Sequence, residues 1–183
     1  MKKVFIVLAL MASLCTQAFA QSEFRERHMA YKGFANFGLG SSFYDGSNST
    51  SFVLTTSHGV QVNPYIFAGA GIGVNLSSSS ETSGATVVAP IFGQVRLNFL
   101  NRQISPFFDL KGGGTVGDLK GGYLEPSIGV SMPVANKFAI DFSFAYTMYT
   151  HKEKYTEWYG YYFANYSNTE ILHNIGFKFG FEF

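Results

Sequence analysis

The chain has 183 residues, of which 46% are hydrophobic, 17% aromatic and only 14% charged, and its formal net charge is +1. The aromatic content excludes a disordered chain, the single cysteine excludes a disulfide-stapled domain, and the near-zero charge excludes a nucleic-acid-binding protein with a basic surface. Glycine, tyrosine, phenylalanine and threonine also displace the good helix formers, which argues against a long helical protein.

Residues 1–20 have the organisation of a cleavable export signal. Two lysines precede an apolar run, and Ala18-Phe19-Ala20 then provides the small residues of a cleavage site. The apolar run is too short to span a bilayer as a helix. We therefore predict that residues 1–20 are removed, together with the only cysteine, and that residues 21–183 form one domain.

From about Met29 onward, apolar and polar residues alternate, which is typical of strands with two different faces. The last segment is the clearest, because phenylalanines at every second position up to Phe183 alternate with glycine, lysine and glutamate. The same alternation predicts eight strands, over residues 30–39, 50–62, 65–76, 85–99, 104–111, 122–132, 137–150 and 171–183.

The connections between these strands alternate in length. Three are tight turns, at Asn63-Pro64, Asn101–Gln103 and Pro133–Asn136. Four are longer and rich in glycine, serine, asparagine or charge, at 40–49, 77–84, 112–121 and 151–168. This asymmetry is typical of outer-membrane barrels. We predict an all-β fold, an eight-stranded antiparallel transmembrane β-barrel with short periplasmic turns and longer extracellular loops.

The strand charges share the polar parity of the alternation, and bases and acids balance there. We predict that they form a polar network in the lumen, made of Lys32, Arg96, Asp109, Lys111, Glu125, Asp141, Lys178 and Glu182. Glycines on the same parity suit a narrow interior, whereas the apolar parity carries more bulky side chains than so narrow a barrel encloses. A soluble barrel with an apolar interior is therefore disfavoured. Arg96 with Asp109, on neighbouring strands, is the expected ion pair.

Aromatic residues at the strand ends suit the girdles that flank the apolar band of a membrane barrel. Tyr146 lies near the extracellular end of its strand, and Phe99 and Phe183 lie near periplasmic ends. His58 fits this scheme poorly, because its parity faces lipid. Either a bulge shifts the register there or the histidine sits at the lipid face uncharged.

At this point the sequence resembles the small OmpA/OmpX-type outer-membrane β-barrel proteins of Gram-negative bacteria. The resemblance rests on the signal, on Asn63-Pro64-Tyr65 leading into Gly69-Ala70-Gly71-Ile72-Gly73, on Pro90-Ile91-Phe92 with Arg96, on Ser105-Pro106-Phe107 and on the closing Gly176–Phe183 stretch. It implies an outer-membrane location and insertion into outer-membrane lipid. It also implies recognition of the terminal Phe179, Phe181 and Phe183 by the outer-membrane assembly machinery. The resemblance is specific for architecture and weak for activity.

The segment 151–168 is the most individual part of the chain. It carries a dense set of aromatic residues, Tyr155, Trp158, Tyr159, Tyr161, Tyr162, Phe163 and Tyr166. Such rings at a barrel rim suit a contact surface for an extracellular protein or glycan ligand. The alternative is that the two flanking strands continue as a hairpin and the rings stack across it.

No motif for catalysis, a cofactor or a metal stands out. Gly69-Ala70-Gly71-Ile72-Gly73 continues along a strand rather than opening a helix, so it is not a dinucleotide-binding loop. The four histidines lack a metal-ligand spacing. His173 with Glu170 and Ser167 is the nearest approach to a hydrolytic triad.

We therefore expect a non-enzymatic outer-membrane protein with a structural or surface-interaction role through its extracellular loops, without cofactor or nucleic-acid partner. The alternative is a narrow channel for ions or small solutes, lined by the lumen charges. A lipid-modifying outer-membrane enzyme is the third hypothesis.

Overall fold

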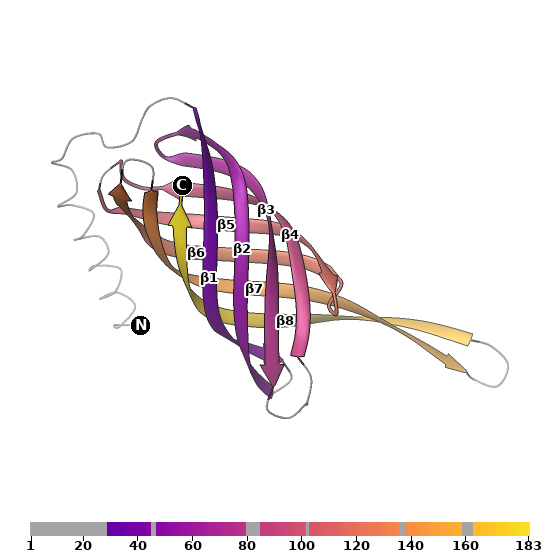
Figure 1. Cartoon of the computed structure of the whole chain (residues 1–183). Helices are drawn as coiled ribbons and strands as arrows, with labels where there is room; N and C mark the ends of the chain where they lie inside the picture. The colour runs from indigo at the N-terminus through magenta and orange to yellow at the C-terminus, as the bar shows by residue number, and fades with distance from the viewer. Residues whose placement is uncertain (1–28, 45–46, 80–84, 102, 136–137, 159–162) are drawn as a thin grey trace, which may run out of the picture.

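The computed structural model describes residues 29–44, 47–79, 85–101, 103–135, 138–158 and 163–183 as one closed antiparallel barrel (Figure 1). The strands are β1 (Ala30–Tyr44), β2 (Ser47–Asn63), β3 (Ile66–Ser79), β4 (Ala85–Asn98), β5 (Ser105–Gly117), β6 (Gly121–Ala135), β7 (Phe138–Trp158) and β8 (Phe163–Glu182). Each strand pairs with its neighbours in sequence, and β8 pairs with β1. Within these ranges, no helix is long and apolar enough to cross a membrane. The predicted fold class is confirmed. The predicted export signal, residues 1–20, lies outside the described residues.

The two faces of the barrel wall have opposite chemistry, as the alternation predicts. Large apolar side chains stand exposed on the outer face, including Leu39 at 65% and Phe177 at 73% exposure. The opposite parity is buried and holds charged, amide and hydroxyl groups such as Arg96 and Lys111, both at 2%. A continuous apolar exterior over a polar interior is the pattern of a barrel solvated by lipid.

The strands are strongly staggered. Paired residues followed across the sheet from Phe183 reach Gly33, His58, Ala70, Gly93, Gly112, Leu124 and Met148, and return to β8 at His173. One circuit therefore climbs from residue 183 to residue 173 of one strand. Such a stagger tilts strands by about 35–45° to the barrel axis. Ten residues at this tilt rise about 25 Å, the height of the apolar band in membrane barrels.

The short connections lie at one end of the barrel, which we call the turn end, together with the C-terminus (Figure 1). The Asn63-Pro64 turn forms as predicted. The side-chain Oδ1 of Asn63 accepts hydrogen bonds from the backbone nitrogens of Tyr65 at 2.8 Å and Ile66 at 2.9 Å. Proline presets the backbone angle of the turn, and asparagine satisfies the amide groups that follow.

At the opposite end, which we call the hairpin end, the strands are longer than predicted. Segments 40–49, 77–84, 112–121 and 151–168 were expected as loops, but strands continue through most of 40–49, 112–121 and 151–168 and into the first three residues of 77–84. The largest difference is in β7 and β8, which pair alone from His151↔Glu170 to Trp158↔Phe163. These eight rungs project well beyond the barrel (Figure 1). Where a strand extends beyond the lipid, its outer face needs no apolar residues. The alternation of apolar and polar residues therefore disappears, and these strand extensions were predicted as loops.

Candidate functional site

The lumen is filled by side chains in layers, and the layer nearest the turn end is built around Arg96 of β4. Its guanidinium Nη1 donates to Asp141 Oδ2 of β7 at 2.7 Å and lies 3.9 Å from Glu182 Oε2 of β8. The guanidinium also lies over two aromatic rings, 3.5 Å from the centroid of Phe107 and 4.7 Å from that of Phe34. Charge pairing and cation–π contact together stabilise a fully buried cation.

The next layer is centred on Glu125 of β6, whose carboxylate is almost completely buried. Oε1 accepts from Lys178 Nζ at 2.5 Å and from Lys111 Nζ at 3.2 Å. Oε2 accepts from the hydroxyls of Tyr123 at 2.7 Å and Thr147 at 3.0 Å. Two ammonium groups and two hydroxyls thus converge on one carboxylate from four strands, so this layer ties together β5, β6, β7 and β8.

All eight residues predicted for the polar network lie on the inner face of the wall. Seven are buried, and Lys32 is partly exposed and pairs with Glu182. The predicted Arg96–Asp109 ion pair is wrong, although the two residues are partners in the β4–β5 register. Arg96 reaches across the lumen to Asp141 instead, because a side chain directed inward in a narrow barrel meets the opposite wall. Asp109 accepts from Gln94 Nε2 at 2.8 Å.

A third layer, towards the hairpin end, is aromatic. The ring of Tyr123 lies between Phe92, at 5.7 Å between centroids, and Tyr149, at 5.6 Å. The hydroxyl of Tyr149 accepts from Asn75 Nδ2 at 2.8 Å. Val88 packs against the same cluster, so the layer crosses the barrel from β3 to β7. We call these three rings the aromatic layer.

The interior also holds aromatic side chains that were not predicted, on the same parity as the polar network. They are Phe34, Phe67, Phe92, Phe107, Tyr123 and Tyr149. The available signal was the glycine on the adjacent strand. A Cβ on Gly71 would lie 2.7 Å from Phe92 Cζ, and one on Gly129 would lie 2.6 Å from Phe107 Cζ. The glycines therefore make room for rings rather than for water.

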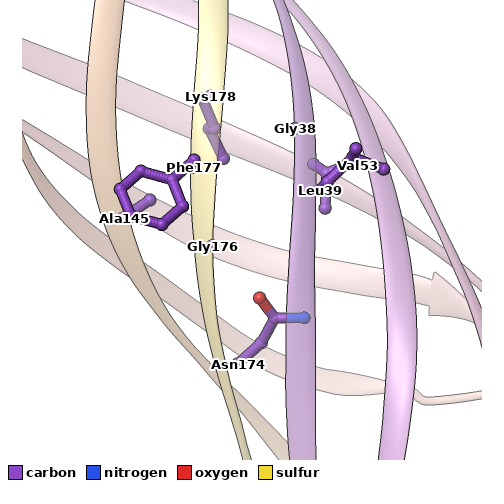
Figure 2. A pocket seen from close by; sticks show the side chains of 8 residues that line it. All are labelled: Gly38, Leu39, Val53, Ala145, Asn174, Gly176, Phe177 and Lys178. Carbon is purple, nitrogen blue, oxygen red and sulfur yellow. The ribbon is translucent and has the colours of Figure 1, made fainter.

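The seam between the last and first strands is closely packed. Figure 2 shows a hollow there that is lined by residues of β1, β2, β7 and β8, but its free volume is about 0 Å³. Asn174 bridges the seam, because its Nδ2 donates to Ser42 Oγ at 2.8 Å and also to Ser51 Oγ. The hollow is a packing feature of the closed wall and offers no room for a ligand.

The outer face carries two tyrosine–histidine pairs. Tyr31 and His58 stack at 6.1 Å near the turn end, with the hydroxyl 2.6 Å from Nδ1. Tyr146 and His173 stack at 5.8 Å nearer the hairpin end, with the same 2.6 Å hydrogen bond. Phe183 contacts the edge of the first pair, with ring centroids 6.1 Å from His58.

The pair with Tyr31 explains how His58 is accommodated on the outer face of the barrel. It stands exposed on the outer face, and the bulge in β2, between Gln61 and Asn63, does not turn it inward. Instead, the Tyr31 hydroxyl and Thr56 Oγ1, at 3.3 Å from Nε2, hydrogen-bond both ring nitrogens. A ring satisfied at both nitrogens is compatible with a lipid-facing girdle position.

The other predicted residues are placed as follows. Phe181 and Phe183 are exposed on the outer face, and Phe179 on the same face packs between Phe142 and Phe181. Tyr159, Tyr161 and Tyr162 lie outside the described residues. The backbone of the hairpin pairs Tyr155 with Tyr166 and Trp158 with Phe163. For these four residues the structure describes the backbone only.

Two of the residues considered for a hydrolytic triad, Glu170 and His173, do not come together, and for Ser167 only the backbone is described. Glu170 lines a cavity on the inner side of the hairpin end, whereas His173 on the outer face is bound to Tyr146. Three residues apart on one strand, they belong to opposite faces. In the part of the chain that the structure describes, no three His, Cys, Asp or Glu residues are grouped to hold a metal ion.

Comparison with known proteins finds similarity at the level of the fold. No protein-family model and no curated protein matches the sequence. Among solved structures, the chain is similar to Neisserial surface protein A, with a TM-score of 0.61 and 11% identity over 84% of this chain and 97% of that one. It is also similar to the outer membrane protein AlkL studied in lipid bilayers, with a TM-score of 0.50 and 10% identity over 90% and 94%. The chain therefore has the fold of the small eight-stranded β-barrels of the outer membrane.

Proposed function

We propose that the protein is an integral outer-membrane barrel with a closed lumen, which acts at the cell surface through the hairpin formed by β7 and β8. The observation that carries this proposal is the combination of a filled interior with a hairpin of eight rungs beyond the barrel. A barrel that neither transports nor catalyses still anchors and presents a surface structure.

The hairpin has the composition of a contact surface. Its two strands carry Tyr155, Trp158, Phe163 and Tyr166, and three further tyrosines complete the segment. The backbone pairing sets aromatic residues opposite one another at two rungs. Cross-strand aromatic pairs stiffen a hairpin, and tyrosine and tryptophan bury large area at a small entropic cost when they bind. We propose an extracellular protein or glycan as the ligand.

The alternative of a narrow channel is less well supported. The lumen charges that would line a water path are paired with one another, and Arg96, Lys111 and Glu125 are each at most 2% exposed. The aromatic layer adds a further obstruction above them. Conduction through this arrangement would require several buried ion pairs to separate at once.

Planar-bilayer recording of the purified full barrel separates the two hypotheses. We expect no steady single-channel conductance. Open-channel steps that are abolished by Arg96→Leu or shifted in ion selectivity by Glu125→Gln would establish the channel and overturn the closed-lumen proposal.

The surface role is tested by replacing residues 152–169 with a short turn in cells that express the protein. We expect the shortened barrel to reach the outer membrane and to keep its heat-dependent gel mobility, but to lose adhesion to immobilised glycans and matrix proteins. A matched variant keeps the hairpin and removes two rings, Tyr155→Thr with Tyr166→Thr, because threonine retains β propensity. Unchanged adhesion in both variants would contradict the proposal.

A further inference from the structure

A cavity of about 350 Å³ lies at the hairpin end of the barrel, directly beyond the aromatic layer. Its size falls within the range of small-molecule sites. Strands β2, β3, β4, β7 and β8 contribute to its lining, together with residues 118 and 119 between β5 and β6. The cavity belongs neither to the filled lumen below it nor to the free part of the hairpin, and we call it the vestibule.

The vestibule has a closed floor. Tyr149 and Val88 line it and are themselves 2% and 3% exposed, because they pack against Phe92 and Tyr123 of the aromatic layer. The hydrogen bond from Asn75 Nδ2 to the Tyr149 hydroxyl fixes the floor in place. A solute that enters the vestibule therefore meets a rigid surface rather than a path through the membrane.

The charges of the vestibule are acidic. Asp118 and Glu170 both line it, and no lysine or arginine is among its lining residues in the described ranges. The carboxylate of Asp118 is oriented by one oxygen, because Oδ2 accepts a 2.7 Å hydrogen bond from the backbone nitrogen of Val87. Among the described residues, no group donates a hydrogen bond to its Oδ1, so this oxygen is available to bind a donor.

The remaining lining is mixed. Leu119, Leu172 and Val88 provide apolar wall, Tyr149 provides a ring, and serine and threonine hydroxyls provide neutral hydrogen-bonding groups. An inorganic cation gains nothing from apolar wall, and two carboxylates without a third ligand make a poor metal site. A cation with a carbon skeleton uses both parts of the lining, since the Asp118 carboxylate attracts the charge and leucines pack against the body.

We propose that the vestibule binds small organic ammonium ions, in which a primary or quaternary ammonium group is carried on a short apolar body. The ammonium group lies at Oδ1 of Asp118, and the apolar body lies against Leu119 and Leu172. This site goes beyond the surface role of the hairpin, because it uses a different part of the molecule.

Titration of the full barrel in phospholipid nanodiscs with n-butylammonium chloride tests the proposal. We expect saturable binding by calorimetry or by NMR shifts of vestibule residues, and none with butyrate or n-butanol at the same concentrations. Asp118→Asn keeps an acceptor for the Val87 nitrogen and removes the charge, and we expect it to weaken binding about three- to tenfold.

Lys120→Gln is the matched control, because Lys120 is exposed in the same connection and does not line the vestibule. We expect it to change the dissociation constant by less than about twofold, because an exposed charge that does not contact the ligand is screened by solvent. Equal and opposite effects of Asp118→Asn and Lys120→Gln would show attraction by the surface potential alone and overturn the site. Equal binding of butyrate, or no saturable binding to the folded barrel, would overturn it as well.

Discussion

The hydroxyl of Tyr146 lies 2.6 Å from Nδ1 of His173 on the outer wall of the barrel, with the two rings stacked at 5.8 Å. Tyr31 and His58 repeat the arrangement near the other end, and in both pairs the residues are 27 positions apart in the sequence. In each case the histidine stands two residues before the register partner of the tyrosine, Val60 for Tyr31 and Ile175 for Tyr146. The same diagonal pair therefore marks both borders of the apolar wall.

Removal of one hydroxyl tests the value of these pairs. We expect Tyr146→Phe to lower the free energy of unfolding by about 1 kcal/mol, because the histidine nitrogen loses its partner at a border with lipid. Urea titration of the barrel in lipid vesicles, followed by gel mobility without boiling, measures the change. Tyr65→Phe is the control, since Tyr65 is exposed at the turn end without a side-chain hydrogen bond from its hydroxyl among the described contacts, and equal losses in both variants would contradict the prediction.

Glu125 is the residue on which we expect the lumen to depend most. Glu125→Gln leaves the ammonium groups of Lys111 and Lys178 buried without the carboxylate that both contact. We expect a loss of about 3–5 kcal/mol in the free energy of unfolding, as found when one partner of a buried ion pair is removed. The same titration of Lys120→Gln, at an exposed position, should stay within about 0.5 kcal/mol of the parent. A Glu125→Gln barrel as stable as this control would show that the layer contributes nothing.

Gly71 tests whether the interior glycines are required by close packing. A Cβ there would lie 2.3 Å from the carbonyl oxygen of Thr56 and 2.7 Å from the Phe92 ring, so the backbone of β2 or the aromatic layer has to move. We expect Gly71→Ala to cost about 1–3 kcal/mol. Gly112→Ala serves as the comparison, since its nearest contact is 3.7 Å from a leucine methyl group on the outer face. The refolding yields of the two variants in lipid vesicles test this prediction. We expect a lower yield for Gly71→Ala than for Gly112→Ala, and equal yields would contradict it.

Phe181 tests the proposed recognition of the C-terminal strand. Phe181 and Phe142 are exposed to 41% and 48% on the outer face, and both pack on Phe179. We expect Phe181→Ala and Phe142→Ala to lower stability in vesicles by similar amounts. In cells, we expect the amount of folded barrel to fall further for Phe181→Ala, measured by quantitative immunoblotting of outer membranes. Parallel losses in cells and vesicles would assign Phe181 a packing role alone.

Much of the barrel follows from sequence, because the lipid-facing and lumen-facing residues of a strand differ so strongly. The alternation from Ile171 to Phe183 predicts both the strand and its outer face, and the structure agrees. The strand ends at the hairpin end do not follow from the sequence, since β1 continues to Tyr44 whereas the alternation predicts an end at residue 39. Pairing there rests on backbone hydrogen bonds, and Gly40 to Ser42 carry no alternation to reveal it.

The sequence predicts which residues face the lumen, but not which of them pair with one another. Strand parity is a local property, so it places Arg96, Asp109 and Asp141 on the same inner face. Which acid Arg96 meets depends on the width and stagger of the closed barrel, and these are properties of all eight strands. The interior rings were missed for a related reason. Phe92 and Tyr123 share the parity of the charges, and the glycine that makes room for Phe92 is recognised only when the register of the adjacent strand is known.

The seam between β1 and β8 has a consequence for assembly. Lys32 meets Glu182 across 150 positions of sequence, and Asn174 meets Ser42 across 132. None of these contacts exists before the first strand reaches the last, so the side chains of Lys32 and Asn174 stay hydrated until that moment. Closure then removes the water from these seam side chains and supplies their partners in one event, which makes it a late and cooperative step. The reverse step has to bring paired charges back to water or lipid, so a barrel that has closed is held closed by its rate of opening as much as by its equilibrium stability.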